Sequence, residues 1–425
     1  MQKVFVLGLG ISGKAVVRYF QEKGASIVIH DDKSSPLPNI ETIDFNHFDL
    51  FVPSPGIPHT HPVYQKALQS KVEIIGEAEL GLKELQDQIC IGVTGTNGKT
   101  TTVKLIEHLL NQSGLSAKSV GNIGESLLDY AKIKNPGTIV VAELSSYQIE
   151  TMTHPTLDLG LILNISPNHL DRHASYEEYC QAKCQLQRCL KKEGKLIVYE
   201  SVYAQCPHYF DSKPILYGPS SDYSTDKIVA KKGKSVVYFL PEDYKKKGMH
   251  EAENALAAWL VVESLGVNAP QFVNGLNTFA KPAHRIEFVA SVADVFYFND
   301  SKSSNTDATM KAVEVMEGPV ILIMGGKDKN IAFAPLRKFK GKIRMILAIG
   351  SNKEKIQEEL KEEFSIEKLS SLEEAVTRAA ELANAGDSVL LSPASSSFDM
   401  FRDYVHRGEE YKRFVHHLEE RRKNS

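Results

Sequence analysis

The sequence lacks the features of several large classes of protein. No apolar run approaches the ~20 residues of a membrane-spanning helix, and the five cysteines are an odd number that indicates no disulfide framework. A formal net charge of -3 gives no basic surface of the kind that binds nucleic acid. The first strand-like stretch has one lysine before it and no small-residue cleavage site after it, so we expect no signal peptide. These absences favour a cytoplasmic protein with neither nucleic-acid nor membrane partners.

Length and hydrophobic pattern predict three α/β domains. At roughly 150 residues per domain, a chain of 425 residues has two to four domains. We place the domains at 1–88, 89–281 and 282–425. Strands are expected at 3–7, 26–30, 89–94, 138–142, 157–164, 194–199, 286–298, 319–324, 344–349 and 387–391. Because helical stretches alternate with these strands, the sheets should be parallel and doubly wound.

The stretch GVTGTNGKTTT, residues 92–102, is close to a phosphate-binding loop but has altered spacing. The pattern G-x-x-x-x-G-K-[ST] requires a glycine where this chain has Val93. The apolar strand ICIGV nevertheless leads into the stretch, and an apolar-periodic helix leads out of it. Backbone N–H groups at such a helix N-terminus bind anions, while Lys99 offers a charge to the phosphates and Thr100 a hydroxyl to Mg²⁺. The sequence therefore predicts an ATP site.

Three further residues of this domain are candidates by position. Glu143 ends the apolar strand TIVVAE, where ligands bind in open α/β sheets, and its carboxylate suits Mg²⁺, although a helix cap is the alternative. His169 follows the strand LGLILNI, a place where a structural histidine is the commoner interpretation. Lys183 lies in the next helix, and its spacing alone indicates a solvated side chain.

The N-terminal domain carries a glycine-rich turn. Gly8-x-Gly10-x-x-Gly13 follows the first strand and opens a helix, and Asp31 and Asp32 end the next strand. This arrangement is typical of dinucleotide sites, in which glycines allow a tight turn and an acid binds a ribose hydroxyl. It predicts a phosphorylated nucleoside without distinguishing NAD from a nucleotide-sugar, and a simple packing turn is the alternative.

The C-terminal domain contains three polar segments, each of which follows an apolar strand. They are NDSKSSNT (299–306), GGKDKN (325–330) and SPASSSFDMF (392–401). Because ligands bind at the carboxyl ends of the strands of an open sheet, we interpret the three segments as one ligand cradle.

Five segments together resemble the Mur ligases, ATP-dependent amide ligases of cell-wall synthesis. The segments are TGTNGKT, HLDRH, KPAHRIE, NDSKSSNT and SPASSSFDMF. The resemblance covers nearly the whole chain, and the loop identifies only the superfamily. GLGISG, SPGIP, HRIE and NDSK favour the D-glutamate-adding branch, since other Mur ligases and folylpolyglutamate synthases carry an Asp-x-Ala-His type segment where this chain has NDSK.

The resemblance implies a fold and a set of ligands. The fold is a Rossmann-like N-terminal domain for UDP, a central P-loop ATPase-like parallel sheet, and a Rossmann-like C-terminal domain for the incoming amino acid. The substrates are ATP, UDP-N-acetylmuramoyl-L-alanine and D-glutamate, in peptidoglycan precursor synthesis. Two Mg²⁺ ions and a Lys183 carbamylated by CO₂ complete the set, and we expect a monomer.

The resemblance also assigns roles to matching positions. It places Gly95, Thr96, Asn97, Gly98, Lys99, Thr100, Thr101, Asn254, Arg285 and Asp300 on ATP. It places Gly10, Ile11, Ser12, Asp31, Asp32, Lys33, Ser54 and Asn122 on the UDP substrate. Metal ligands are Thr100, Glu143, His169 and Lys183, and the catalytic set is Lys99, His169 and Lys183. The residues that it places on D-glutamate are Lys302, Ser304, Lys329, Ser397 and Tyr404. Ser304 and Tyr404 stand where we expect Thr and Phe.

The implied reaction explains these residue types. A carboxylate is a poor electrophile, so ATP converts it to an acyl phosphate, which the amine of D-glutamate attacks. Divalent cations and a lysine neutralise the repulsion between the carboxylate and the triphosphate. Carbamylation turns the cation Lys183 into a carboxylate-like ligand, and Lys302 and Lys329 suit the two carboxylates of D-glutamate. We assign no base for the amine.

Two other functions fit parts of the pattern. An NAD-dependent oxidoreductase would use the N-terminal glycine turn, but it leaves the loop at 92–102, Glu143 and the C-terminal polar segments without a role. A non-enzymatic ATP-gated binding protein would use the same domains, and it would hydrolyse ATP independently of D-glutamate.

Overall fold

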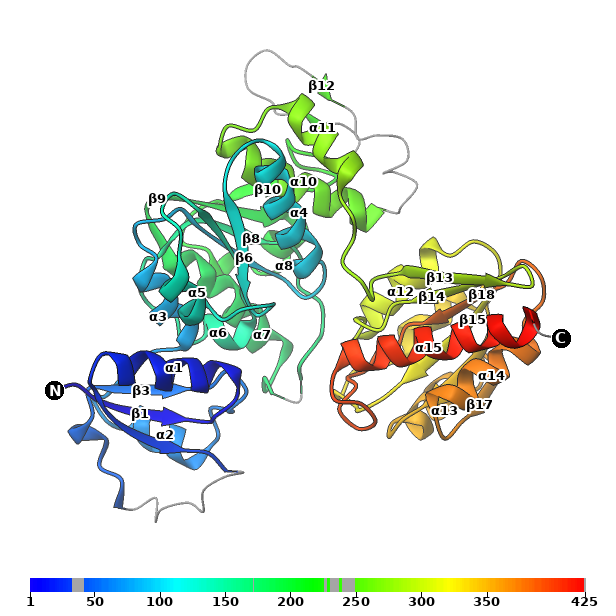
Figure 1. Ribbon diagram of the computed structural model, residues 1–425, viewed down its shortest axis with the longest axis horizontal. Helices are drawn as coiled ribbons and strands as arrows, with labels where there is room; N and C mark the ends of the chain where they lie inside the picture. Colours follow the sequence, from blue (N-terminus) through cyan, green and yellow to red (C-terminus); the bar gives the residue numbers. More distant parts are fainter. Residues whose placement is uncertain (33–41, 171, 225–227, 230–236, 239–248, 424–425) are drawn as a thin grey trace. The chain divides into compact units, whose positions relative to one another are not determined.

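A computed structural model of the chain describes residues 1–32, 42–170, 172–224, 228–229, 237–238 and 249–423. Its sheets are built from parallel strands covered by helices, so the predicted α/β class is confirmed (Figure 1). Two compact units are present. The first is mainly Met1–Ile165, Glu177–Lys245 and Glu251–Phe279, and the second mainly Ser166–Tyr176 and Ala280–Ser425. The predicted boundary at 281 lies near this division, whereas the one at 88 lies inside the first unit and stays a prediction.

The N-terminal sheet of the first unit has four parallel strands in the order β2-β1-β3-β4. The strands are β1 Lys3–Leu7, β2 Ser26–His30, β3 Leu50–Pro53 and β4 Glu73–Ile74. The helices are α1 Ile11–Glu22, α2 Pro62–Leu68 and α3 Glu77–Glu84. Helices α1 and α2 lie on opposite faces of this sheet (Figure 1), each over its own apolar cluster. The predicted strands 3–7 and 26–30 are confirmed.

The central sheet of the first unit has six parallel strands in the order β10-β9-β8-β5-β7-β6. They are β5 Cys90–Thr94, β6 Ala117–Gly121, β7 Ile139–Glu143, β8 Leu157–Ile162, β9 Leu190–Tyr199 and β10 Ile215–Tyr217. The helices are α4 Lys99–Gln112, α5 Leu127–Ile133, α6 Ser146–Ile149, α7 Tyr176–Cys184, α8 Glu200–Gln205, α10 Met249–Ser264 and α11 Ala269–Thr278. A short antiparallel pair, β11 Ile228–Val229 and β12 Val237–Tyr238, precedes α10.

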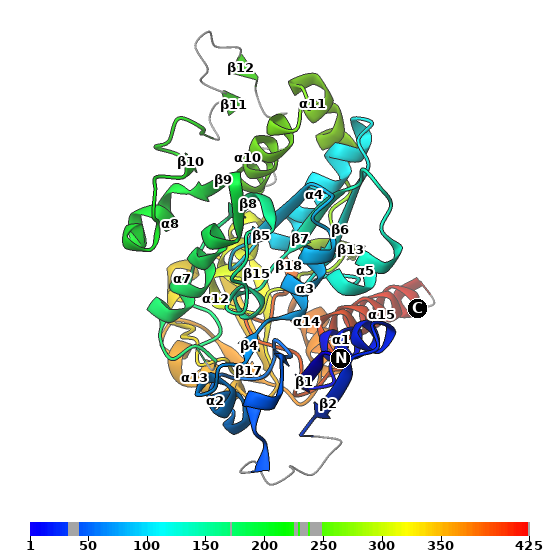
Figure 2. The same ribbon diagram turned by 90° about the vertical axis from the view of Figure 1, so that its left-hand side faces the viewer.

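The core of the central sheet explains the position of its phosphate-binding loop. Strand β5 is buried along its whole length because it lies between β7 and β8, and both of its faces are covered. Apolar residues of α4, α10 and α11 pack in one cluster with those of the sheet. The ribbons of these three helices are seen together in the turned view (Figure 2). The carboxyl end of β5 is thereby a fixed point, from which the chain turns directly into α4.

The sheet of the second unit has the order β13-β14-β18-β15-β16-β17. Its strands are β13 Glu287–Val292, β14 Val295–Asn299, β15 Val320–Gly325, β16 Ile343–Ile349, β17 Ile366–Lys368 and β18 Ser388–Leu391. Helices α12 Thr306–Val315 and α13 Lys353–Leu360 pack on one apolar cluster, and α14 Leu372–Leu382 and α15 Tyr404–Lys423 on the other.

One predicted strand of this unit is wrong. The stretch 286–298 forms two antiparallel strands, β13 and β14, and not one. Ala293 and Asp294 have φ values of 52° and 60°, so the chain reverses between them in the left-handed region that hairpin turns require. The edge of this sheet is therefore antiparallel, contrary to the expectation of purely parallel sheets.

Candidate active site

The turn from β5 to α4 has the geometry of an anion site. Gly95 and Gly98 adopt φ values of 154° and 84°, which a side chain disfavours. Gly98 is the N-cap of α4 and supplies no side chain to its first turn. The N-terminal end of α4 therefore combines the positive end of a helix dipole with N–H groups that have no side-chain cap. The residues predicted to bind ATP at 95–101 therefore lie in this loop and in the first turn of α4.

The side chains of Lys99 and Asn254 both lie against the backbone of this loop. The Lys99 ammonium donates to the carbonyl oxygens of Gly95 at 2.7 Å and Thr96 at 2.9 Å. Asn254, on α10, lies so close to Gly98 that a Cβ there would be 2.5 Å from its Oδ1. The structure thus brings Asn254, predicted only from the family resemblance, to the loop that contains Lys99.

Thr100, in the first turn of α4, is joined to Glu143, at the carboxyl end of β7. The Thr100 hydroxyl donates to Glu143 Oε2 at 2.8 Å, and Asn122 Nδ2 donates to Oε1 at 3.0 Å. Glu143 is 1% exposed at the end of β7. Asn122, predicted on the UDP substrate, therefore lies beside the candidate metal ligand Glu143.

Lys183, on α7, is buried beside the central sheet, contrary to the solvated side chain that its spacing indicates. It is 1% exposed, and its ammonium lies 3.3 Å from Thr94 Oγ1 and 4.8 Å from the centre of the Tyr179 ring. Burial, and secondly the charge of Lys99, hold the pKa of Lys183 well below its usual value. The Tyr179 hydroxyl lies 3.1 Å from Thr96 Oγ1, so α7 is tied to the loop. Spacing gave no signal for either contact.

The oxygen atoms at this end of the sheet suit a magnesium ion that also has phosphate or water ligands. The Thr100 hydroxyl and the Glu143 carboxylate are hard oxygen donors. Within the described part of the chain, no group of three or more His, Cys, Asp or Glu residues could hold a metal ion by itself. Mg²⁺ commonly binds through one or two carboxylates together with substrate phosphates, so the residues fit such an ion. His169 lies in the segment Ser166–Tyr176 of the second unit, with a φ of 57°.

The N-terminal glycine turn is held by close backbone packing and by hydrogen bonds. Gly8 has a φ of 90°, and a Cβ at Gly13 would lie 1.9 Å from the Gly8 carbonyl oxygen. Ser54 donates to the same carbonyl at 2.9 Å, and Leu9 N–H donates to Asp31 at 2.7 Å. Asp31 therefore stabilises the turn itself, a contact that the assignment to a ribose did not anticipate.

Three of the other predicted UDP residues, Gly10, Ile11 and Ser12, lie at the start of α1, directly after this turn. Gly10 is the N-cap of α1 and has no capping side chain, Ile11 is 78% exposed, and Ser12 follows it in the first turn. Asp32 lies 3.0 Å from His30 Nε2 and 3.3 Å from His61 Nε2. Lys33 lies outside the described residues.

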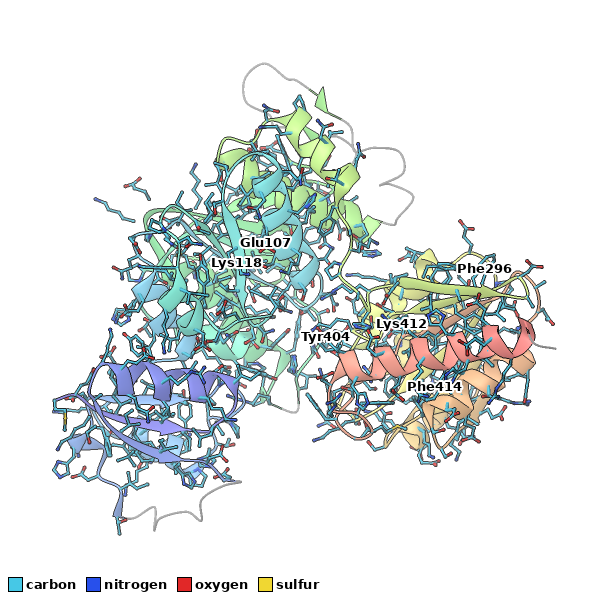
Figure 3. The ribbon with its side chains drawn as sticks, in the orientation of Figure 1. Glu107, Lys118, Phe296, Tyr404, Lys412 and Phe414 are labelled. Atoms are coloured by element: carbon cyan, nitrogen blue, oxygen red, sulfur yellow. The ribbon has the colours of Figure 1, made fainter. Side chains whose placement is uncertain are left out.

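Four of the five residues predicted for D-glutamate form two contacting pairs in the second unit. The Lys302 ammonium lies 3.7 Å from the centre of the Tyr404 ring, and Lys329 donates to Ser304 Oγ at 3.2 Å. Tyr404 begins α15 (Figure 3). Ser397 is buried, and its carbonyl accepts from the N–H of Phe401 at 2.8 Å.

Asp300 is the buried centre of a hydroxyl network. Its Oδ2 accepts from Ser392 at 2.8 Å and from Ser303, and Ile286 N–H donates to Oδ1 at 3.3 Å. Burial raises the pKa of Asp300 to about 6, while these hydrogen bonds and the charge of Arg285 act in the opposite direction. The predicted nucleotide residues Arg285 and Asp300 thus interact with each other.

Arg407 links two of the polar segments and was missed by sequence reasoning. It is 1% exposed on α15, and burial lowers its pKa to about 10. Its guanidinium donates to Ser301 Oγ at 3.0 Å, to the Ser301 carbonyl at 2.8 Å and to the Ser395 carbonyl at 3.2 Å. An arginine in a highly charged helix gives no sequence signal of such a role.

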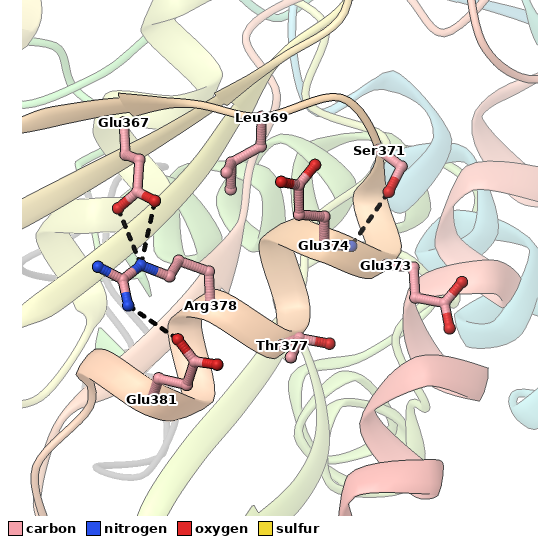
Figure 4. Close-up of a pocket in the computed structure, with 8 residues that line it drawn as sticks. All are labelled: Glu367, Leu369, Ser371, Glu373, Glu374, Thr377, Arg378 and Glu381. Atoms are coloured by element: carbon pink, nitrogen blue, oxygen red, sulfur yellow. Dashed lines mark hydrogen bonds and ion pairs between the residues drawn. The ribbon is translucent and has the colours of Figure 1, made fainter.

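A pocket of about 440 Å³ between β17 and α14 does not contain the predicted residues. Arg378 lies in it between Glu367, at 2.9 Å, and Glu381, at 2.8 Å (Figure 4). Since its one cation is already paired and the remaining charged side chains are acidic, the pocket does not suit an anionic substrate.

Family comparisons cover most of the chain. Residues 2–76 match the Mur ligase MurD-like N-terminal domain, 93–262 the Mur ligase middle domain, and 284–395 the Mur ligase glutamate ligase domain. The chain is 41% identical to the UDP-N-acetylmuramoylalanine--D-glutamate ligase of Protochlamydia amoebophila, over 97% of this chain and 98% of the relative. It is 35% identical to the protein of the same name from Aquifex aeolicus, again over 97% and 98%.

Solved structures share the fold at low sequence identity. A pseudomurein peptide ligase type C from Methanothermus fervidus has a TM-score of 0.62 at 17% identity, over 98% of this chain and 100% of that one. A MurF ligase from Thermotoga maritima in complex with ADP has a TM-score of 0.59 at 15% identity, over 91% and 100%. At these identities the likeness concerns the fold alone.

Proposed function

The chain belongs to the Mur ligase family, and we propose that it adds D-glutamate to UDP-N-acetylmuramoyl-L-alanine through an acyl phosphate. It is an ATP-dependent ligase of peptidoglycan precursor synthesis. The observation that carries the proposal is the Thr100–Glu143 hydrogen bond of 2.8 Å beside the N-terminus of α4. It joins an anion site and hard oxygen ligands at one end of one sheet, as MgATP requires.

The N-terminal end of α4 binds the triphosphate in this proposal. Backbone N–H groups and Lys99 offset phosphate charge, and this electrostatic stabilisation is the main contribution a protein makes to phosphoryl transfer. Mg²⁺, when bound by Thr100 and Glu143, supplies further neutralisation of the phosphate oxygens. The muramoyl substrate's carboxylate then attacks the γ-phosphorus, ADP leaves, and the amine of D-glutamate displaces phosphate from the resulting acyl phosphate.

Lys183 has the chemistry needed for carbamylation. Because burial lowers the pKa of Lys183, the neutral amine, which is the form that attacks CO₂, is favoured relative to an exposed lysine. The nitrogen forms a bond to the carbon of CO₂, one N–H proton leaves, and a buried carbamate anion replaces the neutral amine. The product provides a carboxylate-like ligand for a second Mg²⁺. The metal-binding role of His169 rests on the family resemblance.

The other substrates bind at the two ends of the chain in this proposal. Gly10, Ile11, Ser12, Asp31 and Ser54 form the UDP site of a domain at 1–88. A domain at 282–425 binds D-glutamate through its pairs Lys302–Tyr404 and Lys329–Ser304, since two cations match two carboxylates. The protein acts as a cytoplasmic monomer on small-molecule substrates. No helix among the described residues has the length and apolar character to cross a membrane.

Phosphate release tests the function. With ATP, Mg²⁺ and UDP-N-acetylmuramoyl-L-alanine present, we expect phosphate release to depend on D-glutamate. Lys99→Ala should abolish it, whereas Lys104→Ala, which changes another lysine of α4 that forms an ion pair with Glu107, should not. If the protein instead acts on L-glutamate or a folate, it is still an ATP-dependent ligase, but the assignment of D-glutamate and UDP-N-acetylmuramoyl-L-alanine as its substrates is wrong. Release that is independent of D-glutamate would favour an ATP-gated binding protein, and an NADH fluorescence change would favour an oxidoreductase.

A further inference from the structure

Asn164 holds the phosphate-binding loop by three hydrogen bonds. It follows β8, the strand that pairs with β5. Its carbonyl oxygen accepts from Thr96 N–H at 2.8 Å. Its side chain makes a reciprocal pair with Asn97: Oδ1 accepts from the Asn97 N–H at 2.8 Å, and Nδ2 donates to the Asn97 carbonyl at 3.0 Å. One amide group therefore satisfies both backbone groups of a residue in the middle of the loop.

The same loop fixes the position of the Lys99 ammonium. The carbonyls of Gly95 and Thr96 accept from Lys99 Nζ. Gly95 also packs against Leu163 and Asn164. A Cβ at Gly95 would lie 3.0 Å from Leu163 Cβ and 3.3 Å from the backbone nitrogen of Asn164. The location of the ammonium thus depends on the loop backbone, and the loop backbone depends on Asn164.

We propose that Asn164 is a positioning residue for ATP, which acts by holding the loop backbone and, through it, Lys99. The inference rests on the proposed function for the identity of the nucleotide as ATP. Truncation at position 164 removes the two bonds to Asn97 and leaves the Thr96 bond, which uses the Asn164 main chain. The loop then samples more conformations, and its N–H groups and the ammonium must be ordered when the triphosphate binds.

The chain contains a matched control for this clamp. Asn111, near the end of α4, makes the same reciprocal pair with the backbone of Ala117: Oδ1 accepts from the N–H at 2.9 Å and Nδ2 donates to the carbonyl at 3.1 Å. It lies at the C-terminal end of the helix whose N-terminus forms the anion site. Asn111→Ala therefore breaks an equivalent pair of hydrogen bonds in the same domain, away from the nucleotide.

The experiment compares Asn164→Ala, Asn111→Ala and the unchanged full chain. It measures melting temperature, the Kd of a methylanthraniloyl derivative of ATP, and the KM for each substrate. Both variants should lose melting temperature. Only Asn164→Ala should raise the Kd and the KM for ATP, by about tenfold, which corresponds to the loss of one to two hydrogen bonds, while the KM for the UDP substrate stays within about twofold.

Equal Kd values for Asn164→Ala and Asn111→Ala would overturn the positioning role. Asn164→Ser is measured as a second variant, in case the alanine variant folds poorly. The shorter serine hydroxyl cannot reach both the N–H and the carbonyl of Asn97. An unchanged Kd in a folded serine variant would therefore also overturn the proposal. If the unchanged protein binds the ATP derivative but shows no D-glutamate-dependent turnover, the proposed function fails while the Kd comparison still decides the role of Asn164.

Discussion

The ammonium of Lys302 lies 3.7 Å from the centre of the Tyr404 ring, so two residues far apart in the sequence form one cationic site. The chain around them is tied at two points, since Ser301 donates to the Tyr404 carbonyl at 2.8 Å and Lys302 N–H donates to the His284 carbonyl at 3.1 Å. The negative face of an aromatic ring attracts a cation without neutralising it. The ring therefore contributes to the orientation of the ammonium, which we propose binds a carboxylate of D-glutamate.

This arrangement predicts that the ring of Tyr404 matters more than its hydroxyl. Tyr404→Leu should raise the KM for D-glutamate about two- to fivefold, the equivalent of an exposed cation–π contact, without altering the KM for ATP. Tyr404→Phe keeps the ring and should resemble the unchanged protein. Steady-state kinetics with varied D-glutamate provide the measurement. If phenylalanine is as harmful as leucine, the hydroxyl and not the ring is the important group.

The buried position of Lys183 predicts chemical rescue. Lys183→Ala should reduce turnover on the order of 100-fold, as loss of a group that orients a metal does, and acetate or formate should restore part of it by occupying the place of the carbamate. Lys192→Ala, at an exposed lysine beyond the same helix, should have no effect. ¹³C NMR after addition of labelled bicarbonate should show a carbamate signal in the unchanged protein that the alanine variant lacks. Full activity of Lys183→Ala would rule out the carbamate.

The parts of this molecule that could be predicted are those encoded by local pattern. Strand β1 ends where its apolar run ends, because a buried strand of a parallel sheet must be apolar throughout. The loop from β5 to α4 also follows from local features, namely a strand, two glycines and a helix.

The contacts that could not be predicted join residues from separate elements. Lys183 has the spacing of a solvated lysine, and its burial depends on Thr94 from β5 and on the packing of α7. Arg407 belongs to a highly charged helix, yet its donors satisfy carbonyls near residues 301 and 395. Sequence pattern reports the period of an element and gives no information on which long side chain the tertiary fold encloses.

Glu77 predicts a pH dependence of stability in the first unit. It is 2% exposed at the start of α3, where its carboxylate accepts from Leu128 N–H at 2.8 Å. Burial raises the pKa of Glu77 to about 7, although hydrogen bonds from Leu128 and Ser126 act to lower it. The folded protein therefore binds this proton more tightly than the unfolded chain. The free energy of unfolding should decrease as pH rises from about 4.5 to about 7, by up to about 3 kcal/mol from this group.

Glu77→Gln should remove this part of the pH dependence, because an amide oxygen still accepts from Leu128 and never ionises. Denaturant unfolding at pH 5 and pH 8 should show the variant gaining stability over the unchanged protein mainly at pH 8. The single tryptophan, Trp259 of α10, reports unfolding of this unit by fluorescence. Glu73→Gln, at an exposed glutamate nearby, is the control. A gain for Glu77→Gln that is equal at both pH values would contradict the prediction.

Alanine variants of two glycines at opposite ends of α4 distinguish the effect of backbone strain from the effect of the shape of the nucleotide loop. Gly98 has a φ of 84° and Gly114 a φ of 83°, so an alanine at either position should cost about 1–2 kcal/mol of stability. A Cβ at Gly114 meets no atom within 4 Å, whereas a Cβ at Gly98 would lie 2.5 Å from Asn254 Oδ1. The melting temperatures of Gly98→Ala and Gly114→Ala should therefore fall by similar amounts.

Only Gly98→Ala should weaken ATP binding, about tenfold or more, because the loop or Asn254 must move away from the anion site. Fluorescence titration with the methylanthraniloyl derivative of ATP gives the comparison. Equal affinities in the two variants would mean that the contact between Gly98 and Asn254 does not shape the site.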